Sequence, residues 1–302
     1  MTTTPRQPNM AFELALLLAL ATLWGGSYTF IKLGVATIPP ITLIAARTAI
    51  AGLLLVVIMR MRGVTMSTDG PTWRRFIFQA CLNSVLPFTL IAWAERSVEA
   101  GLATILSSTS PIFVVILGVL AGAGERLSPI KLVGIASGLA GTLLIVGTEA
   151  LAGFGADLAA QLALVAASLC YGGAALFGRH FKGLDPIMPA AGSLICGAAL
   201  LVPFSLAVDR PWTLAPSLAS IQALLTLSVV STALAFVIYF RLIARLGSVA
   251  TTSVAYLRVP TGVLIGMVVL GERVAPTAWA GLVLIVGGVL AMTLPARGRP
   301  TG

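Results

Sequence analysis

Long apolar runs separated by short polar breaks fill most of this 302-residue chain. A helix needs about 20 apolar residues to cross the hydrocarbon core of a bilayer, and no run shows the sustained two-residue alternation of a membrane strand. The runs therefore predict an all-α integral membrane protein with ten transmembrane helices. The predicted spans cover residues 12–36, 41–60, 74–94, 99–122, 129–148, 158–180, 186–208, 218–243, 249–270 and 276–294.

Composition supports the membrane interpretation and argues against other classes of protein. Hydrophobic residues make up 58% of the chain and charged residues 10%, whereas about 25% of a soluble domain is charged. The net charge of +9 is spread singly and in pairs at the ends of apolar runs, so we predict no nucleic-acid partner. The three cysteines lie inside predicted spans, and the single histidine cannot form a His-rich metal site. We therefore predict no enzyme, no metal and no cofactor.

The basic residues at the span ends predict the orientation of the chain in the membrane. Thirteen of them fall on the side of the N-terminus, and three fall on the other side, namely Arg96, Arg210 and Arg273. Because cytoplasmic loops carry an excess of Lys and Arg, both termini are predicted to be cytoplasmic.

The chain also matches itself at a shift of 147 residues. The matching pairs include Trp24-Gly25-Gly26 with Tyr171-Gly172-Gly173, Glu125-Arg126 with Glu272-Arg273, Gly134 with Gly281, and Gly141 with Gly288. We predict two repeats of five spans each, over residues 1–153 and 154–302. Since five is an odd number, the repeats must cross the membrane in opposite directions, which makes them an inverted pair around a central cavity.

Two polar stretches with a proline interrupt predicted spans, Ser107–Pro111 in the fourth and Tyr256–Pro260 in the ninth. Polar groups at membrane depth are costly, and a proline frees a backbone carbonyl that needs another partner or a water-filled cavity. Discontinuous helices that face each other at mid-depth are typical of a transporter's binding site. We therefore expect both helices to be broken at these stretches.

Several short motifs occur in a fixed order along the chain. They are Trp24-Gly25-Gly26-Ser27, Lys32, Pro40, Arg47, and Gly124-Glu125 with Pro129, which is repeated as Gly271-Glu272 with Pro276. Together they resemble the EamA-type drug/metabolite transporter superfamily over about residues 12–295. The resemblance implies a ten-helix basket in which spans 1, 3, 4, 6, 8 and 9 line the cavity. The chain looks most like bacterial amino-acid exporters, which implies a multi-pass protein of the bacterial inner (plasma) membrane. It departs from the family pattern at Tyr171, where a tryptophan is expected, and at Arg258, which matches no motif.

The candidate substrate-binding residues are aromatic, hydroxyl, amide or guanidinium side chains in the proposed lining spans. They are Trp24, Tyr28, Asn83, Ser84, Ser107, Ser110, Tyr171, Phe236, Tyr239, Tyr256 and Arg258. An apolar cavity with hydroxyl groups suits amphipathic organic substrates. Arg258 lies too deep in its span to reach the interface, and it would bind a carboxylate through two parallel hydrogen bonds. An internal hydrogen-bond anchor is the alternative role for Arg258.

Other charged residues have simpler interpretations. Arg47 and Lys32 lie close enough to the outer ends of their spans to reach the interface, and we interpret them as interfacial side chains. Glu125-Arg126 and Glu272-Arg273 are interpreted as interfacial ion pairs, with matched gate elements as the alternative. No titratable carboxylate is apparent at membrane depth, so we expect transport without a required proton gradient.

The sequence thus predicts a transporter that exports small organic metabolites, amino acids above all, by alternating access. A broad-specificity exporter of amphipathic drugs or organic cations is the alternative. The expected partners are a small-molecule substrate and the lipid bilayer, with a monomer as the working assembly.

Overall fold

The computed structural model describes residues 10–121, 129–152, 156–239, 241–242 and 254–293. These residues form helices, turns and loops, and no strand occurs among them. Seven helical stretches in this part of the chain are long and apolar enough to cross a membrane. They are Ala11–Val35, Pro40–Met61, Gly70–Ala94, Ala100–Leu120, Leu158–Phe181, Ile187–Val208 and Leu218–Tyr239. The prediction of an all-α membrane protein is confirmed.

Three shorter apolar helices lie where the remaining spans are predicted, at Leu132–Gly141, Leu257–Leu270 and Pro276–Gly288. Many large apolar side chains on the spans are exposed, including Leu53, Val57 and Phe204. So much exposed apolar surface suits contact with lipid. The count of ten spans stays a prediction.

Local sequence signals explain where several helices begin. Helix α1 covers Met10–Val35, and α2 covers Pro40–Met61 with its proline in the first turn, where no amide hydrogen is needed. Helix α3 (Gly70–Ala80) starts after Asp69, whose carboxylate accepts a hydrogen bond of 2.8 Å from the Thr72 amide. Hydrogen bonds from Ser67 and Thr72 lower the pKa of the Asp69 carboxyl to about 2.

Two spans contain π-helical segments at corresponding places in the two halves. The segment η1 (Cys81–Val85) joins α3 to α4 (Leu86–Ala94), and η4 (Val229–Leu234) follows α10 (Leu218–Ser228). The 147-residue shift carries residues 81–85 onto 228–232, so the two segments overlap. Single π-helical turns are frequent at functional sites because they redirect side chains. Here they present Asn83 from the first half and Ser231 and Thr232 from the second.

The fourth span is interrupted where the sequence predicts it. Helix α5 (Ala100–Ser107) ends in a turn at residues 108–109, and α6 (Ser110–Leu120) begins there with Pro111 in its first turn. The hydroxyls of Ser108 and Thr109 donate to the carbonyls of Ile105 and Leu106, at 2.6 and 2.8 Å. The amides of Ser108 and Thr109 donate to the same two carbonyls, at 3.0 and 3.3 Å, so the turn is closed by both backbone and side-chain donors.

The prediction of a second break, at Tyr256–Pro260, is wrong. Helix α12 runs through Pro260 from Val254 to Ile265 and then becomes the π-helical segment η5 (Gly266–Leu270). Proline removes one helical hydrogen bond, and the hydroxyl of Thr261 donates to the carbonyls of Leu257 and Arg258, each at 2.9 Å. The helix nevertheless continues past its proline.

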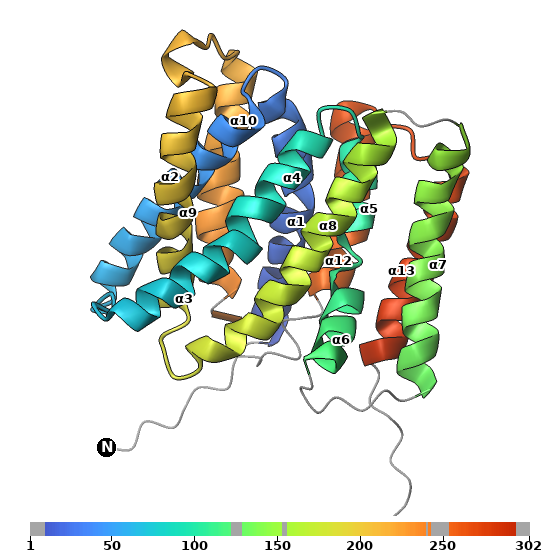
Figure 1. Cartoon of the computed structure of the whole chain (residues 1–302), viewed down its shortest axis with the longest axis horizontal. Helices are drawn as coiled ribbons and strands as arrows, with labels where there is room; N and C mark the ends of the chain where they lie inside the picture. Colours follow the sequence, from blue (N-terminus) through green and yellow to red (C-terminus); the bar gives the residue numbers. More distant parts are fainter. Residues whose placement is uncertain (1–9, 122–128, 153–155, 240, 243–253, 294–302) are drawn as a thin grey trace, which may run out of the picture.

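The helix contacts link the two halves in matched pairs (Figure 1). At one end of the molecule, α7 (Pro129–Ala152) packs against α13 (Pro276–Thr293), and at the other end α2 packs against α9 (Ile187–Val208). Between them, α1 packs on α12, and α8 (Ala156–Phe177) packs on α6 and α4. The contact of α1 with α12 joins spans 1 and 9, and that of α8 with α6 joins the equivalent spans 6 and 4.

Small residues set the close approach of α7 and α13. A Cβ on Gly141 would lie 2.7 Å from the carbonyl oxygen of Gly281, and one on Gly288 would clash with the carbonyl oxygen of Gly134. The 147-residue shift relates Gly134 to Gly281 and Gly141 to Gly288. In the structure each glycine contacts the equivalent of the other one, so the two contacts are themselves related by the repeat. Glycines in membrane helices permit such backbone contact.

Candidate functional site

A cavity of about 850 Å³ lies between the two halves of the chain. Residues of α1, α2, α3, η1, α4, α6, α8, α9, η4 and α12 line it, so both halves contribute. Lys182, Gly183 and Pro186 line its mouth, and all three are exposed in the connection from α8 to α9. Ile31 and Ile91 line the opposite end, where both are buried.

Eight of the eleven candidate residues line this cavity. They are Trp24, Tyr28, Asn83, Ser110, Tyr171, Phe236, Tyr239 and Arg258. Ser84 and Ser107 are fully buried but do not line it. Ser84 lies beside Gly197 of α9, because the π-helical turn directs Asn83 and not Ser84 to the cavity. Tyr256 lies in α12, but its side chain lies outside the described residues. Substrate binding by these residues stays a prediction.

One wall of the cavity is aromatic. Trp24 of α1 packs edge-on against Phe236, with ring centroids 6.3 Å apart, and lies 5.4 Å from Tyr239. Gly25, the next residue, faces the backbone of α12, where a Cβ would lie 2.7 Å from the carbonyl oxygen of Arg258. Gly25 therefore lets α12 approach α1 closely. This approach brings Arg258 to the same cavity as the aromatic wall.

Tyr171, the position where the family pattern expects a tryptophan, also faces the cavity. Its ring lies edge-on to Phe88, with centroids 6.5 Å apart. The 147-residue shift relates Tyr171 to Trp24, and each of the two packs on an aromatic ring of an adjoining span. Gly172 follows Tyr171 as Gly25 follows Trp24, and it faces Phe113 of α6. The two aromatic sites are therefore built in the same way.

Arg47 is a buried cavity residue, and its interpretation as an interfacial side chain is wrong. Only 5% of it is exposed. Its Nε donates to Oγ1 of Thr232 over 3.0 Å, and its guanidinium lies 3.8 Å from the centre of the Phe88 ring. Arg47 comes seven residues after the start of α2 at Pro40, which places it about 10 Å along the helix. A hydroxyl and an aromatic face hold it there, so it does not extend to the interface.

Arg258 lies in α12, in the second half of the chain, and it also lines the cavity. Its Nη2 lies 3.5 Å from the carbonyl oxygen of Ser107, longer than an ordinary hydrogen bond. Its Nε is buried and has no hydrogen-bond partner among the described residues. Tyr171 is close enough to interact electrostatically with both Arg47 and Arg258. The weak bond to Ser107 leaves most of the hydrogen-bonding capacity of Arg258 for a ligand.

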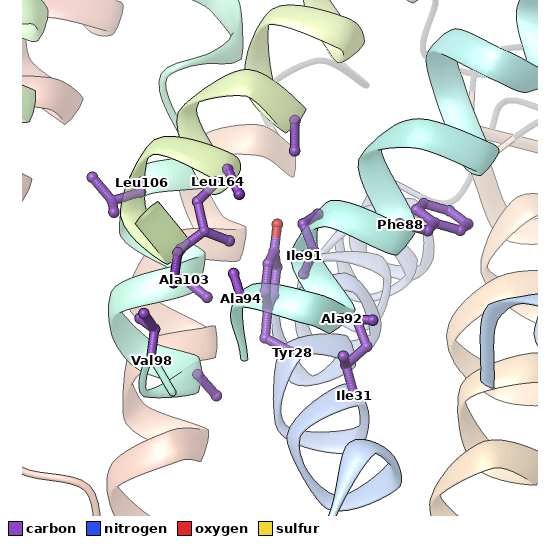
Figure 2. Packing of buried hydrophobic residues seen from close by; sticks show 14 of the residues in the cluster. Tyr28, Ile31, Phe88, Ile91, Ala92, Ala94, Val98, Ala103, Leu106 and Leu164 are labelled. Carbon is purple, nitrogen blue, oxygen red and sulfur yellow. The ribbon is translucent and has the colours of Figure 1, made fainter. Parts of the chain in front are cut away.

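The closed end of the cavity is a packed apolar layer (Figure 2). Tyr28 and Ile31 of α1 meet Ile91 and Ala94 of α4, with Val98 of the following loop in the same cluster. Lys32 donates from Nζ to the carbonyl oxygen of Val98 over 2.7 Å. This end therefore shuts the cavity through contacts between the end of α1 and the loop between α4 and α5.

Glu272 stabilises the start of α5 at the same end. Its carboxylate accepts hydrogen bonds from the amides of Ala100 and Gly101, at 2.6 and 2.8 Å. Two amides at a helix N-terminus are a favourable site for a negative charge. The interpretation of Glu272-Arg273 as an ion pair is wrong, because the carboxylate binds backbone amides of the other half. The equivalent Glu125 lies outside the described residues.

Glu95 is fully buried beside this layer, just after the third span. Neither of its carboxylate oxygens has a hydrogen-bond partner in the part of the chain that the structure describes. Burial raises the pKa of the Glu95 carboxyl well above its ordinary value, against the opposing effect of Lys32. Burial therefore favours the protonated, neutral form of Glu95.

Comparison with known proteins identifies the family. The EamA-like transporter family matches residues 11–147 and 158–294. The chain belongs to the EamA-like transporter family. The first residues of the two matches, 11 and 158, differ by 147, and so do the last, 147 and 294. The family thus occurs twice, in the register that the internal comparison predicts, and the protein is a multi-pass membrane transporter.

Relatives of this EamA-like chain include two bacterial transporters. It is 27% identical to the "Uncharacterized inner membrane transporter YedA" of Escherichia coli (strain K12) over 280 residues, which are 92% of this chain and 89% of that protein. It is 25% identical to the "Uncharacterized transporter YoaV" of Bacillus subtilis (strain 168) over 279 residues, 92% of this chain and 95% of that one.

One relative carries a substrate in its name. The chain is 28% identical over 215 residues to the "Probable terminal-alkyne amino-acid exporter" of Streptantibioticus cattleyicolor, covering 70% of this chain and 69% of that protein. A solved crystal structure, 21% identical, superposes with a TM-score of 0.65 over 95% of this chain and 99% of that chain. The structural likeness shows a shared fold.

The sequence patterns missed several cavity residues of this EamA-like transporter. Besides Arg47, the cavity is lined by Phe88, Gln79 and Ser27. Arg47 and Ser27 belong to the family motifs, and that membership was the one signal that pointed to them. For Phe88 and Gln79, no sequence pattern distinguishes a cavity-lining side chain from one that packs between helices. Among the described residues, no cluster of three His, Cys, Asp or Glu could hold a metal ion.

Proposed function

We propose that this EamA-like transporter exports small organic metabolites that carry a carboxylate, amino acids above all, across a bacterial inner membrane by alternating access. The observation that carries the proposal is the cavity with Arg258 and an aromatic wall between the two repeats. Its volume of about 850 Å³ is within the usual range for small-molecule sites. The alkyne amino-acid exporter among the relatives supports the same class of substrate.

The proposed architecture has ten spans in two inverted five-helix repeats, with both termini cytoplasmic. Two family matches offset by 147 residues and the matched helix contacts support the repeat. The excess of Lys and Arg on one face supports the orientation. In that orientation the mouth at Lys182 faces the cytoplasm and the closed layer at Tyr28 and Val98 faces outward. The cavity would then receive a substrate from inside the cell.

An exporter of amphipathic drugs or organic cations is the alternative. The aromatic wall favours it, because aromatic faces attract cations. Two guanidinium groups in the same cavity oppose it, since the described lining residues include Arg47 and Arg258 but no carboxylate. We therefore favour the carboxylate-bearing substrate.

Transport into proteoliposomes tests the proposal. The purified protein is reconstituted, and the exchange of radiolabelled amino acids is measured beside the exchange of labelled organic cations. Faster exchange of at least one amino acid or related acid than in protein-free liposomes is the expected result. Exchange of cations alone would refute the proposal and support the alternative.

A further inference from the structure

Two guanidinium groups from different halves share one cavity, and both have unused donors. Arg47 is nine-tenths or more buried, and among the described residues only its Nε is hydrogen-bonded. Its two terminal nitrogens therefore have no partner in the described part of the chain. Within the described ranges, Arg258 has a buried Nε without a hydrogen-bond partner and one long contact to Ser107. A buried guanidinium needs an anion or several acceptors to compensate for lost hydration.

The structure holds Arg47 ready for such an anion. Phe88 covers one face of the guanidinium at 3.8 Å, and Thr232 accepts from Nε. Thr232 is itself fixed by a 2.7 Å bond to the carbonyl oxygen of Leu227, five residues earlier, in the π-helical segment. With its plane and Nε fixed, the guanidinium presents a pair of terminal nitrogens, the geometry that binds a carboxylate through two parallel bonds.

The described lining of the cavity offers no acidic group to match a positively charged substituent. The charged residues that line it are Arg47, Arg258 and Lys182 at the mouth, and none of the described lining residues is acidic. An amino acid would bring its ammonium group into a cavity of positive potential. The unpartnered acceptors that remain at the cavity, such as Oγ of Ser231 and Oε1 of Gln79, are neutral. The ammonium would thus be poorly compensated.

We propose that the preferred substrate is an organic anion, an aromatic or arylalkyl carboxylic acid without an ammonium group. Arg47 and Arg258 bind the carboxylate, and the wall of Trp24, Phe236 and Tyr239 binds the apolar body. Thr232 acts as a positioning residue for Arg47. This inference rests on the proposed function: it keeps the export of carboxylate-bearing metabolites but makes net anions, and not amino acids, the preferred substrates of that class.

Three compounds that share a phenylethyl group separate the possibilities. They are 3-phenylpropionate, which is an anion, phenylalanine, which adds an ammonium group, and phenethylamine, which is a cation. In exchange assays on proteoliposomes with the full-length protein, 3-phenylpropionate should have a KM at least tenfold lower than phenylalanine. Phenethylamine should not compete.

The outcomes distinguish this inference from the proposed function. An equal or lower KM for phenylalanine would overturn the preference for anions and leave the proposed amino-acid export standing. Competition by phenethylamine alone would overturn both. No exchange of 3-phenylpropionate and no shift in thermal stability on its addition would overturn the inference as well.

Variants of Arg47 test its role. Arg47→Gln should raise the KM for 3-phenylpropionate tenfold or more while changing that for phenylalanine by less, since the added ammonium already weakens the site. Arg47→Lys keeps the charge without the planar pair of donors. Its KM for 3-phenylpropionate should therefore lie between the values of the unchanged protein and of Arg47→Gln. Arg96→Gln, at an exposed arginine outside the cavity, is the matched control and should change neither value. An unchanged KM in a folded Arg47→Gln protein would make Arg47 a structural residue only.

Discussion

Arg47 of α2 donates a hydrogen bond of 3.0 Å to Thr232, which lies 185 residues later in the chain. The bond joins the second span of one half to the π-helical segment of the other, across the wall of the cavity. Alternating access requires one half to rock against the other. During that motion this bond must either break or hold while Arg47 and Thr232 move together. The contact between the halves thus lies at the candidate site itself.

Arg258 should be required for transport because its guanidinium faces the cavity with unused donors. Arg258→Lys keeps the charge and should retain part of the exchange activity, while Arg258→Met should lose most of it, about tenfold or more. Both variants are measured in proteoliposomes, with insertion and thermal stability checked first. Full activity in Arg258→Met would assign Arg258 to the hydrogen-bond anchor at Ser107.

Gly25 should tolerate no side chain, because α12 touches α1 there through its backbone. A Cβ at Gly25 would lie 2.6 to 2.8 Å from Oγ1 of Thr261, the carbonyl of Arg258 and the amide of Gly262. Gly25→Ala should therefore destabilise the protein by about 1–3 kcal/mol. Gly26→Ala is the control, since its Cβ would meet the end of the Ile265 side chain at 3.3 Å. Equal thermal stability of the two variants in detergent would contradict this packing.

Glu272 should stabilise the protein through the amides of α5 and not through Arg273. Glu272→Ala removes both acceptors and should cost about 0.5–2 kcal/mol. Arg273→Ala should change the stability far less, because Arg273 is exposed. Thermal unfolding of both variants decides between the two roles, and a matching loss in Arg273→Ala would restore the ion pair.

Glu95 should make the folded protein less stable as the pH rises. Burial raises the pKa of its carboxyl above the ordinary value near 4.5, so between these two pKa values the folded state binds a proton that the unfolded state has lost. Stability then falls with rising pH across that window, by at most about 1.4 kcal/mol per pH unit from this group. The charged groups that act on Glu95 are Lys32, Arg47 and Glu272.

Glu95→Gln should remove this slope and raise the melting temperature near pH 7. The comparison is made by thermal unfolding between about pH 5 and 8, in the range where the two states of a buried acid differ. Glu99→Gln is the control, because Glu99 is exposed and its pKa is raised by partial burial and by the negative charge of Glu272. A Glu95→Gln protein that melts lower at pH 7 would show that the ionised carboxylate stabilises the fold.

The orientation predicts which face of the membrane a reagent reaches. Cys81, Cys170 and Cys196 are first replaced, and single cysteines are then placed at Arg62, Arg179 and Thr213, which are exposed. In intact cells a membrane-impermeant thiol reagent should label Thr213→Cys and leave the other two unlabelled until the cells are opened. The reverse labelling would invert the proposed topology.

Much of the fold could be read from the sequence. The apolar runs gave the membrane class and the order of the helices, since span length is set by bilayer thickness and needs no knowledge of packing. The shift of 147 residues pointed to the two family matches and to the equivalent aromatic sites at Trp24 and Tyr171. The turn at Ser108 also followed from local chemistry, because hydroxyls and a proline weaken a helix wherever it lies.

The tertiary structure alone decided which side chains reach the cavity. It placed Arg47 against Phe88 and Thr232, turned Ser84 away, carried α12 through Pro260 and set Glu272 on the amides of α5. A helix in a soluble protein shows its inner face by an apolar stripe, but a membrane helix is apolar toward lipid and toward its neighbours alike. The sequence therefore fixes how long each span is, while the rotation of the span about its axis depends on contacts between residues far apart in the chain.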